Sequence, residues 1–442
     1  MTRLIKEVKN RVRIISRIYY VLVDLKIFIQ YKIIKNKNYK KLIRYKETSH
    51  LNSSTKPIKV VFLVTHAAIW KSDAIFQKML CNKKFEPIIL VIPFLNRNFK
   101  EHNSELMEQT FKFFDEKNYP VLISFKGNDD WLDLKEDLNA DAIFFSNPHK
   151  ITLDKYYEEA FSNYVSYYVP YYYQITKMGG YRPQYNQLFH NAMWKIFSPH
   201  KVALDIHKTI SVNSGCNVID TGYPFSEPFF NENYPNKHDV WKWTGNNKLR
   251  IIWAPHHTID TPQLPFSSFL KYSQFFQDLA FQNKKTIQWS FKPHPLLKEK
   301  LYHFEGWGKE KTDKYWEFWR NSGYTQLDEE EYIDLFKTSD AIIHDSGSFL
   351  VEYMLTNKPA LFLVADEDYK NYFNEMGLMA LFAHNHAKDI EDINNFIKNL
   401  LSKKDPMKEL RAVFLKKNIN NYYEKKLPSD KIIENILNDF LP

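Results

Sequence analysis

Cysteine and glycine are scarce in this chain, and each shortage excludes classes of protein. The 442 residues include two cysteines, Cys81 and Cys216, and neither belongs to a CxxC pair. This argues against a disulfide scaffold and a thiolate metal site, and it fits a reducing compartment. The 11 glycines form no Walker A sequence, GxGxxG fingerprint or GxSxG elbow. Phosphoryl transfer on a P-loop, dinucleotide-dependent hydride transfer and serine-hydrolase chemistry are therefore not expected.

Acidic residues are nearly absent from the first 50 positions. That segment holds 14 basic and three acidic side chains, a net charge of +11, whereas the whole chain carries +9. The remaining 392 residues therefore sum to about −2. A nucleic-acid-binding domain usually carries a basic face on its folded body. The basicity of this chain lies in a terminal arm instead, so no nucleic-acid partner is expected.

The same arm has many apolar residues but no long apolar run. Arg17, Asp24 and Lys26 interrupt it, which argues against a membrane span, and no small-residue cleavage site follows it as in a signal peptide. A basic amphipathic helix on an anionic membrane surface fits this pattern. The alternative is a solvated helix packed on its own protein. We expect residues 1–55 to be a membrane-associating arm.

Beyond the arm, apolar runs alternate with helical patterns in two series. The first predicts strands at 58–64, 87–93, 121–125 and 142–146, with helices at 73–81, 105–117 and 132–138. The second predicts strands at 249–254, 286–292, 341–344 and 360–364, with helices at 266–281, 331–338 and 349–355. Hydrophobic residues make up 44% of the chain, enough for two buried cores. Such alternation is typical of α/β domains with parallel sheets.

This order predicts two Rossmann-like domains facing a cleft. We place the first at residues 56–235 and the second at 248–405, with C-terminal helices at 406–442. Polar residues at 48–57 and 231–247 are expected to connect these parts. Ligands of such sheets bind at the carboxyl ends of the strands.

The sharpest motif of the second domain joins the end of a strand to the start of a helix. It consists of His344, Asp345, Ser346, Gly347 and Ser348, with Glu352 about one turn further. Free N–H groups at the helix start and the serine hydroxyls would form an anion site, and the glycine would let the backbone approach a phosphate. Glu352 would accept hydrogen bonds from a ribose. A capped helix without a ligand is the alternative, since Asp and Ser are common N-caps.

Two more strands of this domain end in polar residues. His256, His257 and Thr258 follow one strand, and Lys292 and His294 follow the next. A lysine supplies fixed charge and a histidine can donate a hydrogen bond or a proton, which suits a diphosphate. A structural role is the alternative for any single histidine. No metal is expected, because His256 and His257 are adjacent and no HExxH motif or cysteine pair accompanies them.

The first domain offers candidates for an acceptor substrate. The turn after its first strand contains His66, Trp70, Lys71 and Asp73, and an aromatic stretch contains Tyr171 and Tyr172. His66 or Asp73 would act as a general base toward an acceptor hydroxyl, and Lys71 would bind an acceptor phosphate. The two tyrosines would stack on a sugar or base. A helix cap, with Trp70 and the tyrosines in packing roles, is the alternative.

At these motifs the sequence resembles the CDP-glycerol glycerophosphotransferase family of teichoic-acid polymerase-like enzymes. The resemblance covers about residues 160–365. It is carried by residues 292–295 (Lys-Pro-His-Pro), 345–348 (Asp-Ser-Gly-Ser), Glu352, 358–359 (Lys-Pro), 221–224 (Thr-Gly-Tyr-Pro) and 253–255 (Trp-Ala-Pro). One feature departs from the family pattern. Many members carry a His-Gly pair in the middle of the chain, where this chain has Pro170, Tyr171 and Tyr172.

The resemblance implies a GT-B fold, membrane attachment and CDP-glycerol as the donor. By this carry-over His294 would bind or protonate the donor diphosphate, and Ser346 and Ser348 would contact phosphate. The expected reaction moves glycerol phosphate to a membrane-linked glycan, releases CMP and requires no cofactor. It would serve capsule or cell-wall polymer synthesis at the cytoplasmic face of the bacterial inner membrane. Two alternatives stay open: a GT-B glycosyltransferase that uses a nucleotide sugar, and a non-catalytic scaffold of a polysaccharide assembly complex.

Overall fold

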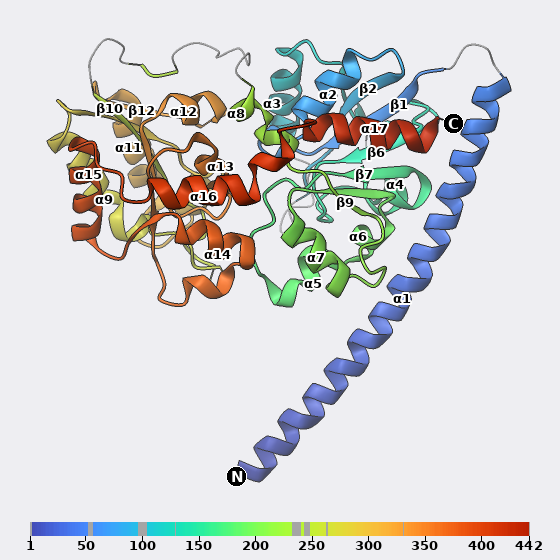
Figure 1. Cartoon of the computed structure of the whole chain (residues 1–442), viewed down its shortest axis with the longest axis horizontal. Helices are drawn as coiled ribbons and strands as arrows, with labels where there is room; N and C mark the ends of the chain where they lie inside the picture. The colour runs from blue at the N-terminus through green and yellow to red at the C-terminus, as the bar shows by residue number, and fades with distance from the viewer. Residues whose placement is uncertain are drawn as a thin grey trace. The chain divides into compact units, whose positions relative to one another are not determined.

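The chain folds into two compact units (Figure 1). Unit 1 comprises Met1–Tyr171, Gly179–Pro224 and Pro428–Pro442, and unit 2 comprises Tyr172–Met178 and Phe225–Leu427. The computed structural model describes residues 2–51, 56–95, 104–128, 130–231, 240–242, 248–261, 264–329 and 331–441, with the side chains of 2–14 and 49–51 excepted. Much of the polar connection predicted at 231–247 lies outside these residues.

Unit 1 is built on a parallel sheet whose described strands are ordered β3-β2-β1-β6-β7-β8-β9. The strands are β1 (Ile58–Val64), β2 (Phe85–Val91), β3 (Val121–Ile123), β6 (Ala142–Phe145), β7 (Val165–Tyr168), β8 (Lys195–Ser198) and β9 (Val218–Asp220). The central strands β1, β6 and β7 consist almost entirely of buried apolar residues, as strands covered on both faces require. The four strands predicted for the first domain are confirmed, with ends shifted by a few residues.

Helices pack on this sheet, and one prediction among them is wrong. The helices are α2 (Asp73–Leu80), α3 (Ser104–Asp115), α4 (Glu158–Asn163), α5 (Arg182–Tyr185), α6 (Leu188–Ala192), α7 (Lys201–Ile210) and α17 (Pro428–Phe440). Residues 132–138, predicted as a helix, form turns after the short hairpin β4 (Phe125–Gly127) and β5 (Asp130–Trp131). Asp133 accepts the backbone N–H groups of Lys135 and Glu136, and this local bonding competes with a helix.

Unit 2 repeats the plan with described strands in the order β12-β11-β10-β13-β14-β15, all parallel. They are β10 (Leu249–Ala254), β11 (Ile287–Phe291), β12 (Thr325–Leu327), β13 (Ala341–His344), β14 (Ala360–Leu363) and β15 (Asn385–Ala387). The helices are α8 (Glu227–Phe230), α9 (Phe269–Gln282), α10 (Leu297–Tyr302), α11 (Gly308–Asn321), α12 (Ile333–Thr338), α13 (Phe349–Glu352), α14 (Glu375–Phe382), α15 (Ile390–Leu401) and α16 (Lys408–Asn418). Strands β12 and β15 are too short to show a clear sequence pattern, and they were not predicted.

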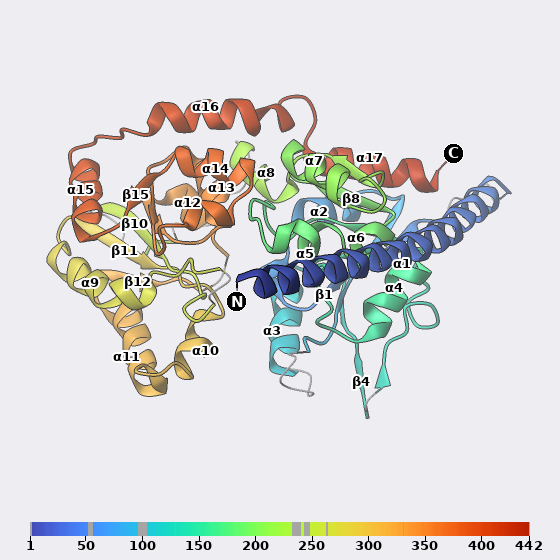
Figure 2. The same ribbon diagram turned by 90° about the horizontal axis from the view of Figure 1, so that it is seen from below.

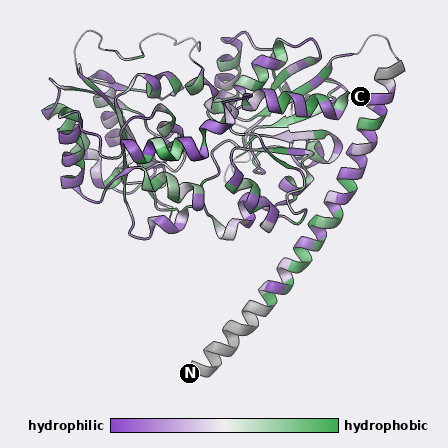
Figure 3. Ribbon diagram, in the orientation of Figure 1, coloured by the Kyte–Doolittle hydropathy of each residue, from purple (hydrophilic) through white to green (hydrophobic). Residues whose placement is uncertain are grey.

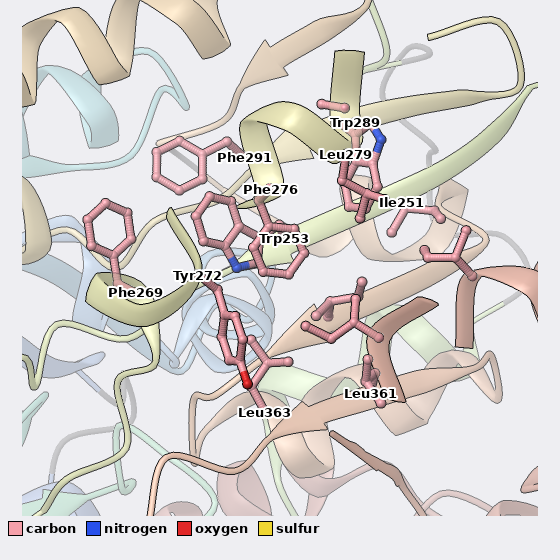
Figure 4. Close-up of a cluster of buried hydrophobic side chains, with 14 of the residues drawn as sticks. Ile251, Trp253, Phe269, Tyr272, Phe276, Leu279, Trp289, Phe291, Leu361 and Leu363 are labelled. Carbon is pink, nitrogen blue, oxygen red and sulfur yellow. The ribbon is translucent and has the colours of Figure 1, made fainter. Parts of the chain in front are cut away.

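Aromatic side chains form the centre of the unit 2 core (Figure 4). Trp253 of β10 stacks on Phe276 of α9 with ring centroids 4.3 Å apart, and Phe291 of β11 lies 5.0 Å from it. All three side chains are fully buried. Such packing fixes the directions of β10 and β11, and with them the positions of the residues that follow these strands.

The N-terminal arm is one helix, α1 (Thr2–Leu51), which includes the first four residues of the polar linker predicted at 48–57. Its C-terminal part contacts α4, α6 and α17 (Figure 2) through a buried stripe: Ile27, Tyr31, Ile34, Asn38 and Leu42. This spacing is that of one helix face. The packed-helix alternative therefore holds for this part of the arm.

Further toward the N-terminus, the same helix exposes apolar side chains (Figure 3). The exposed set includes Ile15, Ile18, Tyr19, Tyr20, Val21, Leu22, Leu25, Phe28 and Ile29. No helix in the described part of the chain contains a stretch apolar enough to cross a membrane.

Candidate functional site

Three neighbouring strands of unit 2 end in the polar residues that the sequence singled out. Strand β10 lies between β11 and β13, with Trp253 opposite Phe291 and Ala254 opposite His344. The residues that follow these strands therefore meet at the carboxyl edge of the sheet. Backbone bonds hold them there: the N–H of Lys292 donates to Trp253 O (2.8 Å), and that of His294 donates to Pro255 O (3.0 Å). Ligands of parallel α/β sheets bind at this edge.

Three histidines, His256, His257 and His294, form an imidazole cluster at this edge. Their ring centroids are 4.4 Å apart for His256 and His257, 5.0 Å for His256 and His294, and 4.1 Å for His257 and His294. The structure thus brings together three residues that the sequence assigned to the donor. Nδ1 of His257 is buried and has no hydrogen-bond partner among the described residues. A ligand atom would satisfy it, because buried polar atoms are generally paired.

Hydrogen bonds fix two of these rings. Nδ1 of His256 shares a hydrogen bond with the Thr258 hydroxyl (3.0 Å). Nδ1 of His294 accepts the backbone N–H of Leu296 (3.1 Å), so the neutral ring carries its proton on Nε2. His294 therefore offers an N–H donor, which suits a phosphate oxygen.

Positive charge surrounds the cluster. Burial, its neighbour His257 and Lys300 of α10 hold the pKa of His256 well below its usual value. Burial and Lys300 lower the pKa of His257 to about 4. Both rings are neutral at pH 7 as a result. Lys292 is also buried here, and its ammonium group lies 5.9 Å from the Tyr332 ring.

The spacing of the three histidines would also admit a metal ion, since one ligand atom from each lies within 4.8 Å of the others. The sequence predicted no metal, and the adjacency of His256 and His257 does not keep their rings from converging with His294. A metal bound through Nε2 of His294 would need that nitrogen unprotonated, contrary to its bond with Leu296. Lys300 lies near the cluster and is ion-paired with Asp260 (2.5 Å). These contacts favour an anion over a metal.

Asp345 joins two segments of the site from a fully buried position. Its Oδ1 accepts the backbone N–H of His256 (2.5 Å), and its Oδ2 accepts that of Ser268 (2.6 Å). Burial raises the pKa of this carboxyl to about 7. The sequence assigned Asp345 to the donor, and the structure uses both of its oxygens to hold the backbone around the imidazole cluster.

The other residues of the predicted 344–348 turn are more buried than the sequence prediction of an anion site at a helix start implied. His344 is fully buried, and its Nδ1 contacts Ser346 O at 3.1 Å. A Cβ on Gly347 would lie 3.2 Å from the Phe266 ring, so a larger residue would need the ring to shift by a few tenths of an ångström. Ser346 is buried, whereas Ser348 is half-buried. Helix α13 has only four residues before a 3-10 turn, so the predicted dipole contribution is small.

Glu352, the predicted ribose ligand, is fully buried and accepts a hydrogen bond from the Tyr332 hydroxyl. Tyr332 also faces Lys292, so Glu352 is connected to the polar strand ends through this tyrosine. Tyr332 was not singled out in the sequence.

In unit 1 the predicted acceptor residues have mainly structural contacts. Trp70 is buried and packs on Phe62 and Phe114, and its Nε1 donates to Asp73 (3.0 Å). Asp73 also accepts the Tyr119 hydroxyl at 3.1 Å. Lys71 is buried as well. The structure therefore gives Trp70 a packing role, and the hydrogen bonds of Asp73 join it to the side chains of Trp70 and Tyr119.

His66 and the two tyrosines lie at other points of the fold. His66 follows β1, and burial lowers its pKa to about 4. Tyr171 belongs to unit 1, after β7, whereas Tyr172 belongs to the short segment that joins unit 2. The structure does not place these two tyrosines in one compact unit.

Residues 183–438 match the model of a family described as CDP-glycerol:poly(glycerophosphate) glycerophosphotransferase. The match covers more than half of the chain and contains the whole imidazole cluster and the 344–348 turn. The chain belongs to this family. The resemblance noted from the motifs is thereby confirmed, and the protein is a glycerophosphotransferase-type transferase.

Solved structures of similar fold cover nearly the whole chain. The wall teichoic acid polymerase TagF shows 13% identity and a TM-score of 0.54, over 96% of this chain and 98% of that one. A putative UDP-N-acetylglucosamine 2-epimerase from Listeria monocytogenes shows 15% identity and a TM-score of 0.53, over 87% and 97%. The predicted GT-B fold of two Rossmann-like domains is confirmed. No curated protein matches the sequence.

Besides Tyr332, two contributors to the unit 2 site escaped the sequence analysis. Lys300 lies on α10, beyond any strand end, and Ser268 contributes only its backbone N–H to Asp345. A basic residue six positions after His294 on a short helix was the available signal for Lys300. Nothing in the sequence marks a backbone donor such as that of Ser268.

Proposed function

We propose that this glycerophosphotransferase family member moves glycerol phosphate from CDP-glycerol to a membrane-linked glycan and releases CMP. The product would be a bacterial capsule or cell-wall polymer. The observation that carries the proposal is the convergence of His256, His257, His294 and Lys292 on one sheet edge within the family match. A solved structure of the polymerase of similar fold was soaked with CDPG.

The donor diphosphate suits the contacts at this edge. Lys292 supplies charge, and His294 donates a hydrogen bond from Nε2. Placed around the leaving phosphate, they would stabilise the charge that develops as the bond to CMP breaks. His257 and the hydroxyls of Ser346 and Ser348 would complete the phosphate contacts. These groups neutralise the diphosphate without a metal ion or a cofactor.

The membrane part of the proposal rests on α1. Its described N-terminal part exposes apolar residues from Ile15 to Ile29, and lysines and arginines flank them in the sequence. A helix of this kind lies in the interface of an anionic bilayer, where each nearby basic residue contributes about 1 kcal/mol. We propose attachment to the cytoplasmic face of the inner membrane, where a lipid-linked acceptor would be within reach.

A label-transfer experiment tests the proposal. CDP-glycerol labelled in its glycerol moiety is incubated with the protein and membrane vesicles from the producing bacterium. We expect the label to sediment with the vesicles and one CMP to appear for each label transferred. Label that stays soluble would contradict a membrane-linked acceptor. Absence of CDP-glycerol binding in calorimetry would instead favour the non-catalytic scaffold.

A further inference from the structure

A fourth strand of unit 2 brings an acidic side chain to the edge that carries the imidazole cluster. Strand β12 lies beside β11, with Leu327 opposite Phe291, so Asp328 is level with Lys292. The backbone N–H of Asp328 donates to Phe291 O at 2.9 Å and continues the ladder past the end of the strand. Asp328 therefore lies one strand away from the predicted donor residues, within the same unit.

The side chain of Asp328 points to the same face of the sheet as that of Lys292. Side chains two residues apart on an extended segment share a face, and Ser290 and Lys292 have this spacing. The Ser290 hydroxyl donates to Oδ2 of Asp328 at 2.6 Å. Because Ser290 reaches the carboxylate directly, Asp328 and Lys292 project on one side of the sheet edge.

Two donors fix one oxygen of this carboxylate. Oδ2 accepts both the Ser290 hydroxyl and Nε2 of Gln326, the latter at 2.8 Å. The Gln326 amide is itself oriented, since its Oε1 accepts the N–H of Lys242 (3.0 Å) and its Nε2 also donates to Val240 O (3.1 Å). No hydrogen bond from the described residues reaches Oδ1, and Asp328 is half-buried. Oδ1 is therefore an acceptor atom in a fixed position at the edge.

The distance between β12 and the imidazole cluster suits a nucleoside. Neighbouring strands lie about 4.8 Å apart, so β12 is about 10 Å from β10, the strand that His256 and His257 follow. The ribose of a nucleotide separates its 5′-phosphate from the 4-position of a pyrimidine by a similar length. Cytosine carries an amino group at that position, and uracil carries a carbonyl oxygen. Carboxylates accept hydrogen bonds from the cytosine amino group.

We propose that Asp328 selects cytosine by accepting a hydrogen bond from the 4-amino group through Oδ1. This inference rests on the proposed function, because it places the base of CDP-glycerol beyond Lys292 when the diphosphate contacts the imidazole cluster. A uracil nucleotide would bring its carbonyl oxygen against the carboxylate, and two acceptors repel each other. Asp328 acts on nucleotide binding and takes no part in the transfer of the phosphoryl group.

Nucleotide affinities of the wild type and of Asp328→Asn test this inference. CMP and UMP are titrated separately into each protein in a calorimeter. The wild type should bind CMP more tightly than UMP by roughly tenfold, within the range by which side chains discriminate bases. In Asp328→Asn, Ser290 and Gln326 hold the amide oxygen, so the NH₂ group takes the place of Oδ1 and donates to the uracil oxygen. The preference should therefore reverse in favour of UMP.

Glu329→Gln is the matched control, since Glu329 is the next residue and its carboxylate has other partners. It accepts Nε1 of Trp316 at 3.0 Å and lies 3.6 Å from Arg320. Its ratio of CMP to UMP affinity should equal that of the wild type. Asp328→Ala, which removes the acceptor without adding a donor, should weaken the binding of CMP alone.

Equal affinities of the wild type for CMP and UMP would overturn the inference. An equal loss of both affinities in Asp328→Asn and Asp328→Ala would also overturn it, and would assign Asp328 to the ribose or to the fold. Release of CMP from CDP-glycerol by the wild type, measured with membrane vesicles, reports separately on the proposed function. Release together with equal affinities would reject only the role of Asp328, whereas absence of release would reject the proposed function.

Discussion

Asp345 is the residue on which the geometry of the unit 2 site depends most. It connects the end of β13 to the backbone of His256 and to Ser268, just before α9. A carboxylate can accept both N–H groups, whereas an asparagine offers one oxygen and would turn its NH₂ group toward the other donor. Leaving a buried donor without an acceptor costs about 1–3 kcal/mol.

The buried carboxyl also predicts a pH dependence of stability. Burial raises its pKa from 3.8 to about 7, so folding takes up a proton between about pH 4 and 7. The free energy of unfolding should therefore fall as pH rises through that window, by about 1.4 kcal/mol per pH unit at most. In Asp345→Asn this contribution should vanish. Denaturant unfolding of both proteins at pH 4.5 and 7 measures it, and parallel changes would reject this account of Asp345.

His294 makes the sharpest residue-scale prediction for activity. His294→Ala removes the donor aimed at the diphosphate, so turnover should fall by roughly 10²–10³-fold, as for loss of one charge-stabilising donor. His294→Asn restores an N–H donor and should recover part of the rate. Circular dichroism checks the fold, since the ring is on a loop. Turnover within threefold of wild type would exclude His294 from the chemistry.

The position of these residues at the sheet edge could be predicted from the sequence, whereas their contacts could not. Polar residues after apolar strands were sufficient to predict that His256, Lys292 and Asp345 share an edge, because parallel strands end together. Burial is a tertiary property, so the inward position of Asp345 and His344 could not be predicted.

At the scale of elements, α1 combines two functions along one helix. Between Ile27 and Leu42 one face of the helix packs on the rest of unit 1, and from Ile15 to Leu25 its apolar side chains are exposed. The arm was foreseen from composition, but charge and hydropathy could not show where its packed part begins. Long, mostly apolar strands such as β1 were predicted well. The helix at 132–138 failed because side-chain bonds to the local backbone stabilise turns there.

The exposed part of α1 predicts membrane binding that two substitutions should abolish. Ile18 and Leu22 are 56% and 61% exposed and lie one helical turn apart. Ile18→Glu with Leu22→Glu places two charges on the apolar face and should reduce cosedimentation with anionic phospholipid vesicles by at least about tenfold. Phe281→Glu with Phe382→Glu, at 56% and 69% exposure on unit 2, is the matched control. Equal losses in both pairs would contradict a membrane role specific to α1.

At the scale of the whole molecule, each of the two units contains a parallel sheet, and we assign a different part of the function to each. Unit 2 carries the charged and imidazole groups that suit a nucleotide diphosphate, and unit 1 carries α1. Nucleotide-sugar enzymes share this fold, so the fold alone does not select the donor. The family match and the contacts of the imidazole cluster favour CDP-glycerol.

Donor selection is the most direct test of the central claim. Purified protein is incubated with membrane vesicles from the producing bacterium and either CDP-glycerol or UDP-N-acetylglucosamine, and released nucleotides are measured by chromatography. The account predicts CMP from CDP-glycerol, at a rate that His294→Ala lowers by at least about a hundredfold, and no UDP from the sugar nucleotide. Release of UDP without release of CMP would contradict it and identify the protein as a glycosyltransferase.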